Sequence, residues 1–223
     1  DGIRIRVNGE GLPQSGQGGA SLNDAIESMG GVGDLLQRAS ASGDSDLASA
    51  FERAAATFGQ NGRAVALGAA GNAAGLDGNV GLQNAFNIAA SRTSSGADVS
   101  SALFAGAASA AELNGNDSLR WLYQSAQYGM DTGDFETAVD VATGERPMID
   151  VMFDVAIDMA SDSDVPGGSD IVWAARDAYE SGTMSAEEAV MVALEVATDA
   201  TGDYQTADLV EAAIDVSKGG DPI

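Results

Sequence analysis

Three aspartates, Asp150, Asp154 and Asp158, are spaced four residues apart in a segment that is otherwise largely apolar. Side chains at this spacing lie on one face of a helix, where three like charges repel one another. Exposure to solvent, a bound cation or a basic partner would each relieve that repulsion. We assign Asp150 and Asp154 to an interface with a basic protein surface, and Asp158 to a candidate cation site.

The segment that follows the stripe is rich in oxygen ligands. It contains Asp162 and Asp164, followed by two glycines and Asp170. Carboxylate oxygens are the ligands that calcium prefers, so Asp158, Asp162 and Asp164 form a candidate calcium site. The segment lacks the central glycine and the later bidentate glutamate of an EF-hand loop, so the site would fall outside that class. No other cofactor is expected.

The composition excludes several catalytic chemistries. The 223 residues include no histidine and no cysteine, so a Ser-His-Asp triad, a cysteine nucleophile and an imidazole or thiolate metal site are all excluded. No phosphate-binding glycine loop, dinucleotide fingerprint or nucleophile elbow is present. With 34 acidic residues, the sequence cannot select one carboxylate pair for glycoside hydrolysis. We therefore expect a protein that is not an enzyme.

The chain is strongly acidic, with a formal net charge of −24. This charge argues against a nucleic-acid partner and against binding to an anionic membrane surface. No apolar run reaches the 18 residues that a membrane-spanning helix needs, so membrane insertion is not expected. Most of the charge lies after residue 115, where 23 acidic residues face only 4 basic ones.

The composition also bears on location. Nine of the ten cations are arginine, and an acidic, lysine-poor surface is typical of proteins in a salty or extracellular medium. Removal of a signal peptide would explain a chain that begins at Asp1. We expect an extracellular or cell-surface protein, and a cytoplasmic location stays open as the alternative.

The first 20 residues differ from the rest of the chain. Ile3, Ile5 and Val7 alternate with Arg4 and Arg6, which is the two-residue period of a half-buried strand. A Gly/Ser/Gln-rich run then extends to residue 19 and is typical of a flexible linker. Residues 1–20 are therefore interpreted as an extended arm, and residues 3–7 as its interface with another copy of the chain.

After residue 20 the sequence has the regularly spaced turn residues that are typical of an all-α protein. Turn glycines recur at intervals of 14 to 20 residues, with one interval of 35, and each interval leaves room for one average helix. Taken in pairs, the expected helices form units of similar length, preceded by a short helical entry at 21–41. The predicted units are 45–75, 81–113, 117–143, 147–181 and 185–217.

Helix pairs of about 35 residues are typical of α-solenoids, in which each pair packs on its neighbours. We therefore predict a right-handed α-solenoid of about five helix pairs over 21–217, with a short tail at 218–223. A compact irregular helical bundle is the alternative.

The large apolar side chains are interpreted as anchors of the core, because the helices between them consist mainly of alanine and glycine. Trp121 and Trp173 are partial exceptions, since tryptophan is also enriched at interfaces. The anchors are Leu47, Phe51, Phe58, Leu82, Phe86, Leu103, Phe104, Trp121, Leu122, Phe135, Phe153, Trp173, Tyr179 and Leu194.

Two short motifs resemble a known family. Gly133-Asp134-Phe135-Glu136-Thr137-Ala138 and Gly202-Asp203-Tyr204-Gln205-Thr206-Ala207 match one another. Both are similar to the segment that opens the second helix of a tetratricopeptide repeat, and Trp121-Leu122-Tyr123 resembles the aromatic start of a first helix, one position out of register. Glu145 and Asp150 depart from the family pattern. The resemblance covers about 117–217 and implies packed helical hairpins with a concave, protein-binding face.

Two functions fit these patterns. In the first, the chain is a non-catalytic structural subunit that self-associates into a filament or layer, with the arm contacting a neighbouring copy. A strand in an otherwise helical chain needs a partner for its backbone groups, and strand addition supplies one. In the second, the chain is a monomeric adaptor that binds a peptide or protein on its concave face.

Overall fold

The computed structural model describes residues 31–138, 146–163, 166–202 and 204–218, and within these ranges the protein contains ten α-helices and no β-strand. The prediction of an all-α protein is thereby confirmed. The helices are α2 (Val32–Ala41), α3 (Ser45–Phe58), α4 (Gly62–Leu76), α5 (Val80–Ser94), α6 (Val99–Leu113), α7 (Asp117–Thr132), α8 (Met148–Ser161), α9 (Gly168–Glu180), α10 (Ala186–Thr201) and α11 (Tyr204–Ser217).

The turns that separate the helices have a recurring local chemistry. Residues 76–82 and 113–119 share the pattern Leu-Asx-Gly-Asn-x-x-Leu, and the glycines at their centres, Gly78 and Gly115, are 37 residues apart. Both glycines have positive φ angles, of 77° and 72°. The asparagine after each glycine caps the next helix by accepting a hydrogen bond from the leucine N–H, at 3.0 Å in both turns. The same turn is thus repeated after one helix pair.

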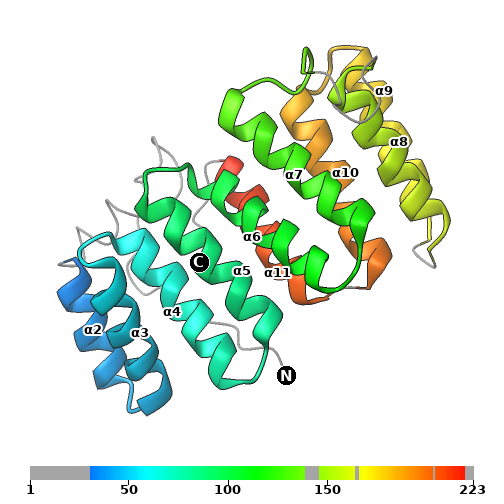
Figure 1. Ribbon diagram of the computed structural model, residues 1–223. Coiled ribbons are helices and arrows are strands. Elements are labelled where there is room, and N and C mark those ends of the chain that lie inside the picture. The colour runs from blue at the N-terminus through cyan, green and yellow to red at the C-terminus, as the bar shows by residue number, and fades with distance from the viewer. Residues whose placement is uncertain (1–30, 139–145, 164–165, 203, 219–223) are drawn as a thin grey trace.

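The helices from α2 to α7 form a row in which each helix packs on the next, as Figure 1 shows from blue to green. A second group follows, in which α8, α9 and α10 pack on one another, and α10 also touches α7. The last helix, α11, packs on α10 and returns to lie against α6 and α5 (Figure 1). This return joins the two groups. It differs from simple solenoid stacking, in which each unit contacts only its neighbours.

Four of the five predicted helix pairs correspond to two helices each: 45–75 to α3 and α4, 81–113 to α5 and α6, 147–181 to α8 and α9, and 185–217 to α10 and α11. The pair predicted at 117–143 is wrong in part, because the described part of it contains α7 alone and residues 134–138 are not helical. Residues 21–30 and 139–145 of the predicted helical segments lie outside the described residues.

The two motifs that resemble a tetratricopeptide repeat behave differently. Helix α11 begins at Tyr204, inside the second motif, as expected. In the first motif, α7 ends at Thr132 and Phe135 is buried against Gly129 instead of opening a new helix. The resemblance itself stays a prediction.

The centre of the core is formed by α6, α7, α8 and α10. Leu103, Phe104, Leu122, Phe153 and Leu194 were all expected in the core and are fully buried. Around these anchors the helices approach through small residues: a Cβ atom added at Gly106 of α6 would overlap the Ala85 carbonyl oxygen of α5. Where large side chains are few, the helices therefore bury their surfaces by packing closely through small residues.

Candidate functional site

The aspartate stripe on α8 has basic partners within the same chain. The Arg176 side chain of α9 lies 3.0 Å from Asp154 and 4.0 Å from Asp150, and Arg146 lies 2.7 Å from Asp154. Arg176 also contacts Glu180 at 2.9 Å and lies over the Trp173 ring, 5.5 Å from its centroid. These contacts relieve the repulsion that the sequence implied. The assignment of Asp150 and Asp154 to an interface stays a prediction. Within the chain, their carboxylates already form ion pairs with Arg146 and Arg176.

The carboxylates around Arg176 affect its protonation. Its pKa is raised from the ordinary value, chiefly by the hydrogen bond to Glu180, with further contributions from the charges of Asp154 and Asp150. Arg176 therefore stays charged and links α8 to α9.

The candidate calcium site is only partly described. Asp158 and Asp162 are exposed at the C-terminal end of α8, and Asp164 lies outside the described residues. Within the described ranges, no group of three or more acidic side chains is arranged to hold a metal ion. The arm residues Ile3, Arg4, Ile5, Arg6 and Val7 also lie outside the described residues.

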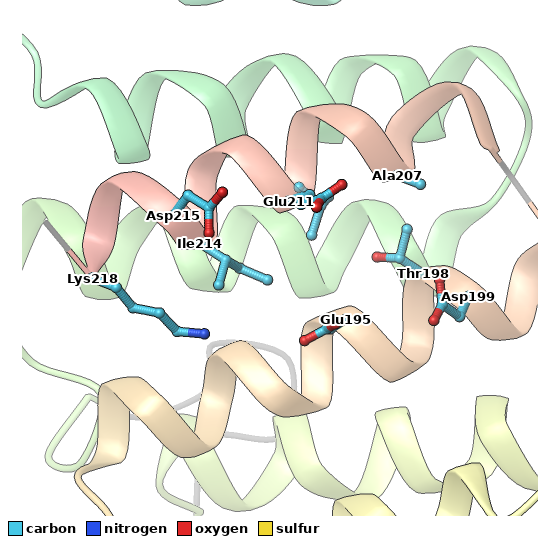
Figure 2. A pocket seen from close by; sticks show the side chains of 9 residues that line it. Glu195, Thr198, Asp199, Ala207, Glu211, Ile214, Asp215 and Lys218 are labelled. Atoms are coloured by element: carbon cyan, nitrogen blue, oxygen red, sulfur yellow. The ribbon is translucent and has the colours of Figure 1, made fainter. Parts of the chain in front are cut away.

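A groove that the sequence interpretation missed lies between α10 and α11 (Figure 2). It has a volume of about 300 Å³. Val210 and Ile214, 2% and 5% exposed, form an apolar floor together with buried Thr198. The walls are acidic and exposed, and they consist of Glu195 and Asp199 from α10 and Glu211 and Asp215 from α11, with Lys218 at one end. We call this feature the acidic groove.

The local sequence explains the acidic groove. Along α11 the lining residues recur three or four positions apart, so they form one stripe on the helix. The apolar members of this stripe are Ala207, Val210 and Ile214. Each of them is followed directly in the sequence by an acidic residue. The floor is held from below, because the Thr198 hydroxyl donates to the Leu194 carbonyl at 2.7 Å and lies 2.7 Å from the Tyr123 hydroxyl of α7.

A second cleft, of about 380 Å³, lies between the end of α7 and the start of α10. Glu187 lines it, and burial raises the pKa of this side chain, with smaller contributions from the charges of Glu188 and Asp98. Glu188, the next residue, has a lowered pKa because the Ser185 backbone N–H and hydroxyl both donate to it in a capping box.

These opposite shifts predict opposite pH effects of two neighbouring substitutions. A raised folded-state pKa means that ionised Glu187 opposes folding above that pKa, and the cost disappears as the pH falls through it. Glu187→Gln should therefore raise the melting temperature at pH 7 by about 1–2 °C. Glu188→Gln should lower it, because the amide oxygen can still accept the capping hydrogen bonds but the negative charge that strengthens them at neutral pH is lost. Thermal unfolding of both variants at pH 7 and pH 3.5 tests this, and the differences should shrink at the lower pH. Equal effects of both variants at pH 7 would contradict the assignment.

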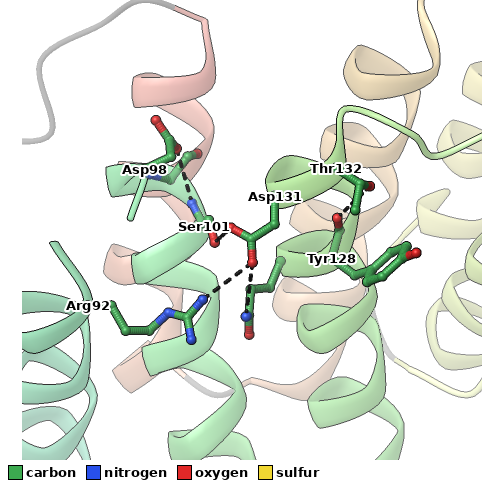
Figure 3. Close-up of polar contacts among 8 residues, drawn as sticks. Arg92, Asp98, Ser101, Tyr128, Asp131 and Thr132 are labelled. Carbon is green, nitrogen blue, oxygen red and sulfur yellow. Dashed lines mark hydrogen bonds and ion pairs between the residues drawn. The ribbon is translucent and has the colours of Figure 1, made fainter. Parts of the chain in front are cut away.

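A serine and carboxylate arrangement that resembles catalytic machinery is structural. Ser101 of α6 donates to Asp131 of α7, and Asp131 also accepts from Gln127 and from Arg92 of α5, both at 3.3 Å (Figure 3). Ser101 is 0% exposed, so no substrate can reach its hydroxyl. The network instead ties three consecutive helices together.

Comparisons with known proteins found no match: no family model, no curated protein and no solved structure resembles this chain at a significant level. None of the described helices combines the length and the hydrophobicity that a membrane-spanning segment needs. The site is therefore interpreted from its own chemistry.

Proposed function

We propose that this protein is a non-catalytic structural subunit that self-associates, with the arm of one copy contacting a neighbouring copy. The observation that carries the proposal is that the described part of the chain contains helices only. A strand formed by residues 3–7 would find no partner strand there, so its backbone groups would need one from elsewhere. Residues 3–7 of a second copy would supply it, by strand pairing between the two arms.

Two finer features belong to the same proposal. The helix pairs are arranged as a right-handed solenoid, and the row from α2 to α7 and the repeated turn at Gly78 and Gly115 support the stacking of repeated pairs that a solenoid requires. The assembly is a filament or layer, and its location outside the cell or on its surface is supported by the net charge of −24 and the single lysine.

Replacing Ile5 with proline should abolish assembly, because proline removes the backbone N–H that strand pairing needs. Deleting residues 1–7 should act in the same way. The matched control is Gln17→Pro in the Gly/Ser-rich segment, where no strand is expected. Sedimentation velocity and electron microscopy measure assembly, and far-UV circular dichroism checks that the helices remain. A wild-type protein that stays monomeric at high concentration, or a truncated protein that assembles normally, would overturn the proposal.

The second candidate function is a monomeric adaptor for a peptide or protein. The observation that favours it is exposed apolar surface on α9, where Ile171 and Trp173 are 49% and 48% exposed. Exposed tryptophan is enriched among residues that anchor protein interfaces. A wild-type monomer in the sedimentation experiment would favour this function.

A further inference from the structure

We infer that Asn114, in the turn between α6 and α7, is a site of spontaneous deamidation, whereas the fold protects Asn61 from the same reaction. The reacting group is the asparagine side chain itself, the co-reactant is water, and no enzyme takes part. Each of these asparagines is followed by glycine, and the two pairs have opposite surroundings. The third Asn-Gly pair of the chain, Asn8-Gly9, lies outside the described residues. This modification is independent of self-association.

An asparagine that precedes glycine can react through a cyclic imide. The Gly115 backbone nitrogen attacks the Cγ atom of Asn114, the new N–Cγ bond replaces the Cγ–Nδ2 bond, and ammonia leaves with the proton of the Gly115 N–H. Water then opens the ring, adding its hydroxyl to one of the two carbonyl carbons and its proton to the nitrogen. Opening at Cγ gives aspartate. Opening at the backbone carbonyl gives isoaspartate, whose main chain runs through Cβ. Glycine favours ring closure because it has no side chain to obstruct its nitrogen.

Asn114 and Gly115 lie in an exposed turn. Asn114 is the C-cap of α6, and both residues are exposed. A Cβ atom placed on Gly115 would meet no atom within 4 Å, so the space beside its backbone is open. Leu113, the last residue of α6, is itself 60% exposed. Ring closure at Asn114 therefore takes place at the surface and needs no opening of the core.

One backbone hydrogen bond must open before the ring can close. The Gly115 N–H donates to the Glu112 carbonyl at 3.0 Å, and Glu112 is exposed as well. Hydrogen bonds in the last turn of a helix open by fraying, which costs far less free energy than global unfolding. This bond slows the attack of the Gly115 nitrogen without preventing it.

Asn61 has the same following residue in the opposite setting. As the N-cap of α4, its Oδ1 atom accepts from the Ala64 N–H at 3.1 Å, and its Nδ2 atom donates to the Thr93 carbonyl oxygen of α5 at 3.5 Å. Gly62 is buried and is the first residue of α4, which packs between α3 and α5. Ring closure would break the cap and displace the start of this helix, so it requires loss of packed structure.

The other copy of the repeated turn shows that one product fits. Asp77 occupies the position of Asn114 there, with φ and ψ of −78° and 0°, against −82° and −2° for Asn114. Aspartate at position 114 should therefore be tolerated. Isoaspartate adds one atom to the main chain of the turn. It shifts the Gly115 and Asn116 N–H groups, which close the end of α6 through hydrogen bonds of 3.0 and 2.9 Å. Asn116 is also the N-cap of α7, so isoaspartate should weaken the junction of the two helices.

The test incubates the full-length protein in a mildly alkaline buffer, because the attacking nitrogen must lose its proton. Peptide mapping by mass spectrometry follows the deamidated fraction at Asn61 and Asn114, and chromatography separates aspartate from isoaspartate. The same protein in urea gives the intrinsic reactivity, since both Asn-Gly pairs are then exposed. Asn114→Gln is the control variant, because its longer side chain closes the ring far more slowly. Asn114→Asp reproduces the tolerated product.

In the folded protein, Asn114 should deamidate about tenfold faster than Asn61 or more, because only Asn61 requires packed structure to open. In urea the two rates should become similar. Protein aged until most of position 114 is isoaspartate should melt about 2–4 °C below fresh protein, which is the effect of a lost helix cap. Fresh Asn114→Asp should melt within about 1 °C of the wild type. Asn114→Gln should keep its melting temperature over the same incubation.

Three results would contradict the inference. Equal rates at Asn61 and Asn114 in the folded protein would show that the fold does not select between them. An Asn114 that reacts in urea but stays intact in the folded protein would show that the turn is closed to the reaction. An aged protein that contains isoaspartate at position 114 and melts like fresh protein would overturn the predicted effect on the junction of α6 and α7.

Discussion

Replacing Gly106 with alanine is expected to destabilise the protein by about 1–3 kcal/mol, although alanine is the better helix former. The reason is the close approach of α5 and α6. The new Cβ atom would overlap the Ala85 carbonyl oxygen and lie 3.0 Å from the Ala85 carbonyl carbon. These are backbone atoms of a buried residue, so no side-chain rotation can make room and one helix must move.

The matched control is Gly33→Ala in α2. Gly33 is also a helical glycine, but a Cβ atom there would meet no atom within 4 Å. This substitution should stabilise the protein by about 0.5–1 kcal/mol, because it only removes the entropic cost of glycine in a helix. Urea denaturation of both variants gives the two free energies of unfolding. A stabilising Gly106→Ala would mean that α5 and α6 are farther apart in solution than in this structure.

The helices could be predicted because their signals are local. A glycine that allows a positive φ, followed by an asparagine that caps the next helix, ends one helix and starts another within four residues. The turn at Gly115 has this chemistry and lies where the glycine spacing predicted it. Gly133 also ends a helix as expected, but Phe135 then packs onto Gly129, and the glycine spacing carries no information about this side-chain contact.

The return of α11 to α6 could not be predicted in the same way. One of its contacts joins the Ser100 hydroxyl to the Ala213 carbonyl oxygen, and the two residues are 113 positions apart. Neither residue type indicates a distant partner, because serine and alanine occur throughout this chain. A repeat pattern describes how neighbouring units pack, and it carries no information about a helix that crosses back to an earlier unit.

In the candidate site, too, some features could be predicted from the sequence and others could not. The sequence predicted that the stripe at Asp150 and Asp154 needs a counter-charge, but it could not show that Arg176, 22 residues after Asp154, supplies part of it. The acidic groove was missed although α11 carries a signal for it. Val210 and Ile214 are each followed directly by an acidic residue, which places an apolar line beside an acidic line on the helix.

Phe153 and Trp173 provide the sharpest test of which anchors form the core. Both are large aromatic residues among the predicted core anchors, and Trp173 is a partial exception because tryptophan is also enriched at interfaces. Phe153 is 0% exposed and packs against Tyr179 with ring centroids 6.2 Å apart, whereas Trp173 is 48% exposed on the outer face of α9. Burial, and not residue size, should therefore decide the cost of removing each side chain.

Phe153→Ala should destabilise the protein by about 3–5 kcal/mol, because it removes buried apolar area and leaves a cavity in a close-packed core. Trp173→Ala should cost less than about 1 kcal/mol, since it chiefly removes the interaction of the half-exposed ring with the Arg176 guanidinium. Urea denaturation measures both, and an unchanged dependence on urea concentration would show that the two variants unfold from comparably compact states. If Trp173→Ala cost as much as Phe153→Ala, the face of α9 would have to be covered in the folded protein. A second copy of the chain would then be the first occupant to test, by repeating the measurement over a range of protein concentrations.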